Sequence, residues 1–108
     1  MAMIPFRDLV AAHLASHHPA TDGWTIQRDL LLEDGAEIHF LVGRDRQRFV
    51  AHCKAEVGNV LFEHVDHAAN LAEKAAAGSA VLYVPIGSFT PPVILAYAGE
   101  RHVRIQAL

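Results

Sequence analysis

The sequence has 108 residues, of which 52% are hydrophobic and 19% are charged, and its formal net charge is −3. This length suits a single domain over residues 1–108, and the composition excludes a disordered chain. The negative net charge argues against a strongly basic nucleic-acid-binding surface, although a local basic patch is compatible with it. A domain of this size buries a modest core, so we also expect a homodimer interface to add stability.

The first half of the chain predicts one helix followed by three strands. Apolar residues recur at helical spacing after Pro5, and Pro19 ends that helix. Three strands are expected after it, over residues 24–32, 36–42 and 49–55. The pair Asp34-Gly35 is a hairpin signal between the first two strands, and the polar stretch 43–48 forms the next turn.

The second half predicts two helices that alternate with two strands. The first helix is expected over residues 60–77, with Asn59 as its N-cap and Gly78 as its C-terminal stop. After it we expect a buried strand over 80–84, a short helix over 93–98 with Thr90 as its N-cap, and a last strand over 102–107. The β-branched start of the short helix leaves a strand as the alternative there. The order α-β-β-β-α-β-α-β predicts an α/β fold with a mixed sheet and helices on both faces.

Signals for export are missing from the sequence. The N-terminal residues lack a basic stretch followed by a long apolar run, and no apolar run is long enough to span a bilayer. The one cysteine, Cys53, excludes an internal disulfide and suits a reducing compartment. We therefore expect a cytoplasmic protein with no membrane partner, in which Cys53 is a small buried apolar side chain.

Histidine is the compositional outlier, with eight residues. A turn centred on Asp45-Arg46 would place His39 opposite His52, and Glu37 opposite Lys54, on one face of two antiparallel strands. A slip of one residue in the strand register would break this arrangement.

Two interpretations of these four residues remain open. One is a cross-strand ion pair between Glu37 and Lys54 beside two hydrogen-bonded histidines. The other is a metal or acid/base site in which Glu37, His39 and His52 bind a transition metal.

Three histidines on the predicted helices bear on the metal interpretation. His13 and His17 lie four residues apart in the apolar stripe of the first helix, a spacing at which two imidazoles can share a metal. They can equally lie half exposed at the margin of the core. His67 belongs to a polar helix stripe and is expected to be solvated.

The order of elements and a few local motifs resemble a known superfamily. The matching segments are Gly23-Trp24, residues 35–39, the Val50–Lys54 strand and residues 81–108. On these segments the chain resembles the restriction-endonuclease-like superfamily, whose active-site pattern is PD-(D/E)xK. It is most similar to the Mrr-type nucleases and the archaeal Holliday-junction resolvases. The resemblance implies a restriction-endonuclease-like domain.

The resemblance also implies a degenerate active site. Lys54 matches the catalytic lysine, while His39 stands at the position of the strand aspartate and His52 at that of the Asp/Glu. The acid often found in the first helix falls near Arg7-Asp8 and has no secure match. Mg²⁺ prefers oxygen ligands, so two imidazoles should nearly abolish its binding. Either hydrolysis has been lost, or the pocket takes a softer metal such as Zn²⁺, Ni²⁺ or Mn²⁺.

Three functions follow as hypotheses. The first is a nuclease-like domain without hydrolysis that serves as a nucleic-acid-associated binding or regulatory module. Weak DNA binding would then use Arg44, Arg46 and Arg48. The second is a metal-dependent nuclease or hydrolase whose site consists of Glu37, His39, His52 and Lys54. The third is a homodimeric interaction protein with an apolar surface around Phe62, Phe89 or Tyr97.

Overall fold

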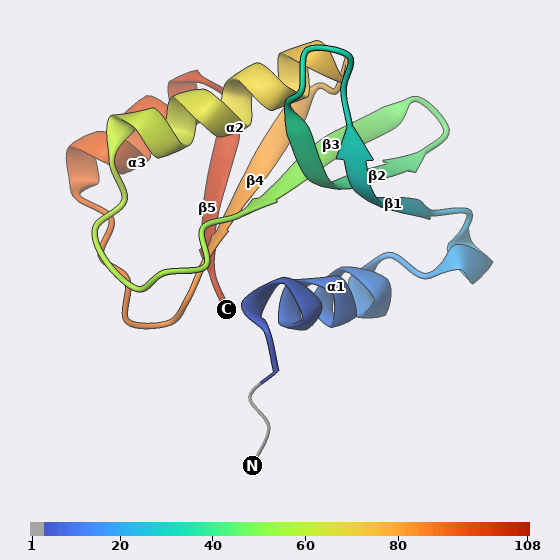
Figure 1. Ribbon diagram of the computed structural model, residues 1–108, viewed down its shortest axis with the longest axis horizontal. Helices are drawn as coiled ribbons and strands as arrows, with labels where there is room; N and C mark the ends of the chain where they lie inside the picture. Colours follow the sequence, from blue (N-terminus) through green and yellow to red (C-terminus); the bar gives the residue numbers. More distant parts are fainter. Residues whose placement is uncertain (1–3) are drawn as a thin grey trace.

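The computed structural model describes residues 4–108 and contains one five-stranded sheet between helices (Figure 1). The elements in chain order are α1 (Phe6–His17), the 3-10 turn η1 (Ala20–Asp22), β1 (Thr25–Leu31), β2 (Glu37–Arg44), β3 (Gln47–Cys53), α2 (Phe62–Lys74), β4 (Ser79–Val84), α3 (Pro92–Glu100) and β5 (Val103–Ala107). Among these residues, no helix is long and apolar enough to cross a membrane.

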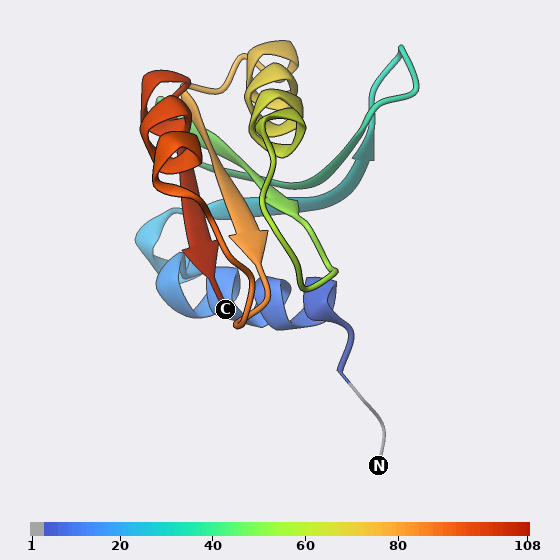
Figure 2. The same cartoon turned by 90° about the vertical axis from the view of Figure 1, so that its left-hand side faces the viewer.

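The sheet is open and mixed, with strand order β1-β2-β3-β4-β5. The first three strands pair antiparallel through short hairpins, whereas β3, β4 and β5 run parallel. Parallel neighbours need a crossover, which α2 and α3 supply. Figure 2 shows α1 on one side of the sheet and α2 with α3 on the other. The predicted class, an α/β fold with a mixed sheet and helices on both faces, is therefore confirmed.

The sheet separates two hydrophobic cores. Val10 and Leu14 of α1 pack with Phe40, Ala51 and Tyr83 on one face. On the other face, the buried side of α2 and α3 packs against alternate residues of the same strands, among them Val65, Leu71, Ile94, Val50 and Leu82. Period-two alternation along the strands sends neighbouring side chains to opposite cores, which is why β4 is buried and apolar from Ala80 to Val84.

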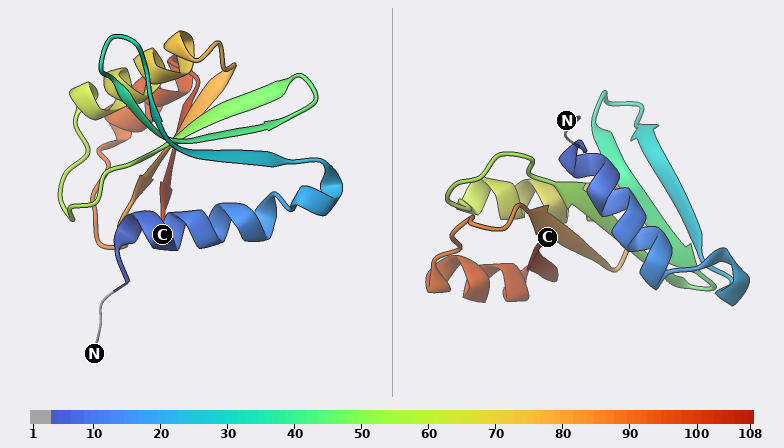
Figure 3. Two further views of the ribbon diagram at one scale, coloured as in Figure 1. Left: turned by 45° about the vertical axis from the view of Figure 1, so that its right-hand side comes forward. Right: turned by 90° about the horizontal axis from the view of Figure 1, so that it is seen from below.

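The β1–β2 hairpin bends away from the sheet toward the end of α2 (Figure 3). Within β1, Asp29 has a left-handed backbone conformation with φ of 57°, and beyond it Leu30 joins the core under α2. Lys74 at the end of α2 forms an ion pair of 2.6 Å with Asp34 in the hairpin turn. The expected Asp34-Gly35 turn is present, and Gly35 there has φ of 87°.

Two expected helix boundaries of α2 are wrong. Helix α2 begins after Leu61, because Asn59 instead pairs with Phe89 in an isolated parallel bridge. At its other end, Ala76 takes the left-handed conformation expected near a glycine stop, with φ of 54°. Gly78 lies beyond, where its backbone N–H donates to the carbonyl of Arg48.

The short helix before the last strand is present as α3, and the strand alternative is wrong. Its N-cap position is Pro91, with Pro92 in the first turn, so Thr90 does not cap it. Proline at the first turn lacks an N–H that the helix could not have paired in any case.

Candidate functional site

His39 and His52 meet where the β2–β3 ladder ends. The two-residue turn at Asp45-Arg46 sets the register expected from the sequence, and the last paired residues are Phe40 and Ala51. The next residues in that register are His39 and His52. Their imidazole rings stack with centroids 4.2 Å apart and planes 13° apart. The structure thus brings these two histidines together as the hairpin pattern predicts.

His39 is buried and contacts groups on two sides. Its Nδ1 lies 3.0 Å from the backbone N of Cys53, and its Nε2 lies 2.9 Å from Nη2 of Arg7. In a neutral imidazole one ring nitrogen carries a proton and the other carries a lone pair. Only one of these two contacts can therefore be a hydrogen bond that the ring accepts. The backbone N–H of Cys53 and the Nη2 of Arg7 are both donors, so they compete for that one lone pair. Arg7 also contacts other groups beside His39.

Those other groups are two carboxylates. Nη1 of Arg7 lies 3.1 Å from Oδ1 of Asp29 and 3.0 Å from Oε1 of Glu37. One terminal NH₂ group of a guanidinium carries two hydrogens, so Nη1 can donate to both carboxylates. Helix α1 thereby inserts a fixed positive charge beside His39, at the edge of the stacked imidazoles.

The cross-strand ion pair expected between Glu37 and Lys54 is absent. Glu37 pairs with Arg7, and the Nζ of Lys54 donates to the backbone carbonyl of Glu56 at 2.7 Å. The physical reason is that the β2–β3 ladder ends before these residues, so nothing keeps them opposite each other.

His52 lies between His39 and α2. The ring of His67 meets it edge-on, with centroids 4.8 Å apart. His67 is exposed as expected, but its contact with His52 was not predicted. A pocket of about 480 Å³ opens at this point, and its lining residues are His52, Lys54, Glu63, His64, His67 and Leu82. His64 uses its Nδ1 to accept a hydrogen bond of 2.9 Å from the backbone N–H of Leu61, at the start of α2.

Burial keeps the stacked imidazoles uncharged near neutral pH. It lowers the pKa of His52 from 6.5 to about 3, helped by the nearby imidazoles of His39 and His67. It also lowers the pKa of His39, with the charge of Arg7 adding to the effect. The Nδ1 of His52 is buried and has no hydrogen-bond partner among residues 4–108. The site therefore offers neutral imidazoles and one unsatisfied nitrogen beside a guanidinium.

The metal interpretation finds little geometric support. Across residues 4–108, no group of three or more His, Cys, Asp or Glu side chains is placed to hold a metal ion. The ring centroids of His13 and His17 lie 4.2 Å apart with the planes tilted by 32°, but His13 faces Tyr83 of β4 and Gln106 of β5. That pair therefore belongs to a different part of the sheet from His39 and His52. Cys53 is buried, and burial raises the pKa of its thiol to about 11.

The arginines of the β2–β3 hairpin lie at the opposite end of these strands. The guanidinium of Arg44 stacks over the ring of Trp24, 4.5 Å from its centroid. Arg46 occupies the turn, and Arg48 pairs across the ladder with Gly43. All three lie away from the stacked histidines.

The fold defines the class of the protein as an α/β domain with a five-stranded, open, mixed sheet. No protein-family model and no curated protein matches the sequence.

Solved structures with a similar fold do exist. One is the "Protein of Unknown Function AF1548", with a TM-score of 0.68 and 16% identity over 94% of this chain and 55% of that one. Another is SfsA of Pyrococcus furiosus in complex with Ca²⁺, with a TM-score of 0.52 and 16% identity over 95% of this chain and 54% of that one. The chain thus spans about half the length of each, and at this identity the likeness shows the fold alone.

Proposed function

We propose that the chain is a nuclease-fold domain that has lost metal-dependent phosphodiester hydrolysis and serves as a nucleic-acid-associated binding or regulatory module. The resemblance of residues 35–54 to the restriction-endonuclease-like superfamily supports the nuclease ancestry. One observation carries the loss of hydrolysis. The guanidinium of Arg7 lies between Asp29 and Glu37 and borders His39. A reducing compartment such as the cytoplasm suits the buried thiol of Cys53.

The contacts of Arg7 oppose a magnesium site. Hydrolysis in the family resembled needs Mg²⁺, which takes oxygen ligands. The carboxylates of Asp29 and Glu37 already pair with Arg7, Arg28 also lies 3.5 Å from Asp29, and the two strand positions carry imidazoles. A divalent ion at this place would also face the repulsion of the guanidinium at close range. The residues present therefore do not fit Mg²⁺.

Binding to nucleic acid would use the basic hairpin. Arg44, Arg46 and Arg48 are clustered by the β2–β3 turn and can contact phosphates without reading sequence. Because the chain has a net charge of −3, such binding is weak and falls steeply with salt.

Two assays on the untagged protein test the proposal. Gel retardation at low salt should show binding of nucleic acid that disappears as salt rises. Incubation of the same substrates with Mg²⁺ or Mn²⁺ should give no cleavage above a buffer control. Cleavage that requires metal and is lost in Lys54→Ala would contradict the loss of hydrolysis, and absence of retardation at low salt would contradict the binding role.

A second candidate is a hydrolase or nuclease that uses Zn²⁺, Ni²⁺ or Mn²⁺ at His39 and His52. The unsatisfied Nδ1 of His52 favours it, since a buried imidazole nitrogen without a partner suits a soft metal. The Ca²⁺ bound by SfsA gives it no support, because Ca²⁺ takes oxygen ligands. This candidate requires the side chain of Arg7 to leave His39, and bound metal would distinguish it from the first proposal.

A further inference from the structure

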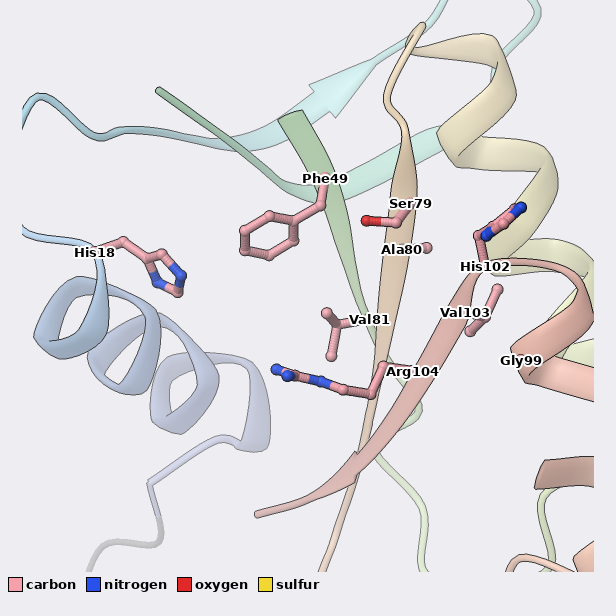
Figure 4. Close-up of a pocket in the computed structure, with 9 residues that line it drawn as sticks. All are labelled: His18, Phe49, Ser79, Ala80, Val81, Gly99, His102, Val103 and Arg104. Carbon is pink, nitrogen blue, oxygen red and sulfur yellow. The ribbon is translucent and has the colours of Figure 1, made fainter. Parts of the chain in front are cut away.

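A groove lies at the end of the sheet remote from the stacked histidines, bordered by the end of α1 on one side and by the end of α3 and its following turn on the other (Figure 4). It has a volume of about 480 Å³, and its lining residues are His18, Phe49, Ser79, Ala80, Val81, Gly99, His102, Val103 and Arg104. Phe49, Val81 and Arg104 point from three neighbouring strands toward α1, and His18 at the end of α1 faces them. The groove is thus built on rigid strands and is bordered by two helix ends.

Three aromatic rings form a row beside this groove, and two of them, His18 and Phe49, line it. The rings of Trp24 and His18 meet edge-on at 4.7 Å, and those of His18 and Phe49 lie 5.3 Å apart. Arg44 stacks over Trp24 at the outer end of the row, and Arg104 lies across the groove from it. We call Trp24, His18 and Phe49 the aromatic row.

The groove continues toward the basic hairpin. A neighbouring pocket of about 370 Å³ is lined by Trp24, Arg46 and Arg48 and shares Phe49 and Ser79 with the groove. The two hollows therefore form one path from the β2–β3 turn to β5, with arginines at both ends and aromatic rings between them.

Positive charge is left uncompensated along this path. Elsewhere in residues 4–108, Arg7, Arg28, Lys74 and Arg101 form ion pairs with carboxylates. Within the same part of the chain, no carboxylate lies within ion-pair distance of the remaining arginines, which are Arg44, Arg46, Arg48 and Arg104. The acids on segments that border the path are Asp22 in η1, Asp45 in the hairpin turn and Glu100 at the end of α3, three against four arginines.

We propose that this path binds single-stranded nucleic acid, with phosphates on the arginines and bases against the aromatic row. The inference rests on the proposed binding role and names its site and substrate class. Positive grooves with aromatic side chains are how proteins hold single strands without reading sequence. Unpaired bases can enter such a groove, whereas the bases of a duplex are stacked and paired and present mainly phosphates.

Fluorescence anisotropy with a labelled oligothymidine of about 12 nucleotides tests the assignment, since grooves of this kind hold single strands of that order. The wild-type chain should bind it more tightly than a duplex of the same length at low salt. Arg104→Gln should weaken binding and reduce the slope of log affinity against log salt by about 0.7. Phe49→Leu should weaken binding about fivefold or more, while Phe49→Tyr retains it. Lys74→Gln removes one charge remote from the groove and should leave binding unchanged.

The outcomes separate this inference from the proposed function. Binding to duplex alone, or wild-type affinity in Arg104→Gln, would overturn the assignment of this groove as a single-strand site. The proposed nucleic-acid-binding role would then still stand. Absence of binding to either probe would overturn both. If thermal unfolding shows that Phe49→Leu is not folded, the salt slope of Arg104→Gln decides the matter, because Arg104 is an exposed side chain.

Discussion

Acidification should destabilise this chain through the buried imidazole of His52. Its pKa is lowered from 6.5 to about 3 in the folded protein. Between those values the unfolded chain binds a proton on this side chain and the folded chain does not. The free energy of unfolding must therefore fall as the pH falls through that window, and it is unaffected by His52 above the window.

The size of this effect follows from linkage. One group can change the free energy of unfolding by up to about 1.4 kcal/mol for each pH unit. Domains of this size are stable by only about 5–15 kcal/mol, so the loss is measurable within two pH units. Burial also lowers the pKa of His13, His39 and His64, so their contributions have the same sign.

Urea unfolding at a series of pH values measures the slope. Trp24 is the one tryptophan, and it packs against His18 and Arg44, so its fluorescence should report the transition. His52→Gln should reduce the slope below pH 6.5, whereas Ser16→Ala, which changes an exposed residue of α1 that does not titrate, should not. A stability that stays constant through this window, or an unchanged slope in His52→Gln, would refute the reasoning.

Three further predictions concern the rest of the molecule. Arg7→Met removes two partly exposed ion pairs and should lower the free energy of unfolding by about 1 kcal/mol, which is roughly 4 °C in Tm. An unchanged Tm would show that these ion pairs contribute nothing to stability. Leu14→Ala empties a fully buried site between α1 and the sheet and should cost about 2–5 kcal/mol in chemical denaturation. Phe62 and Phe89 are 47% and 58% exposed, and we expect them to lie in the interface of the proposed homodimer. Sedimentation should therefore show a dimer for the wild-type chain and a monomer for Phe89→Asp. A monomeric wild-type chain would contradict the dimer.

The part of the site that is local in sequence could be predicted. A two-residue turn at Asp45-Arg46 fixes the register of its hairpin, and that register brings His39 and His52 together. The same reasoning fails for Glu37 and Lys54, because the ladder ends before it reaches them. Sequence periodicity says which residues alternate, but it does not say where two strands separate.

The contacts that complete the site depend on tertiary packing. Arg7 reaches Asp29 and Glu37 only because α1 lies across the sheet, and His67 reaches His52 only because α2 crosses the other face. A single basic residue at a helix start gives no signal of such partners. Asn59 was expected to cap α2 on local chemistry, but its pairing with Phe89, far along the chain, took precedence.

Elemental analysis of the untagged protein, purified without an affinity metal column, tests the central claim most directly. If Arg7 takes the place of a cation beside His39, the protein should contain far less than one transition-metal ion per chain. Near-stoichiometric Zn²⁺, Ni²⁺ or Mn²⁺ that is lost in both His39→Ala and His52→Ala would contradict the account. The pocket would then be a converted metal site.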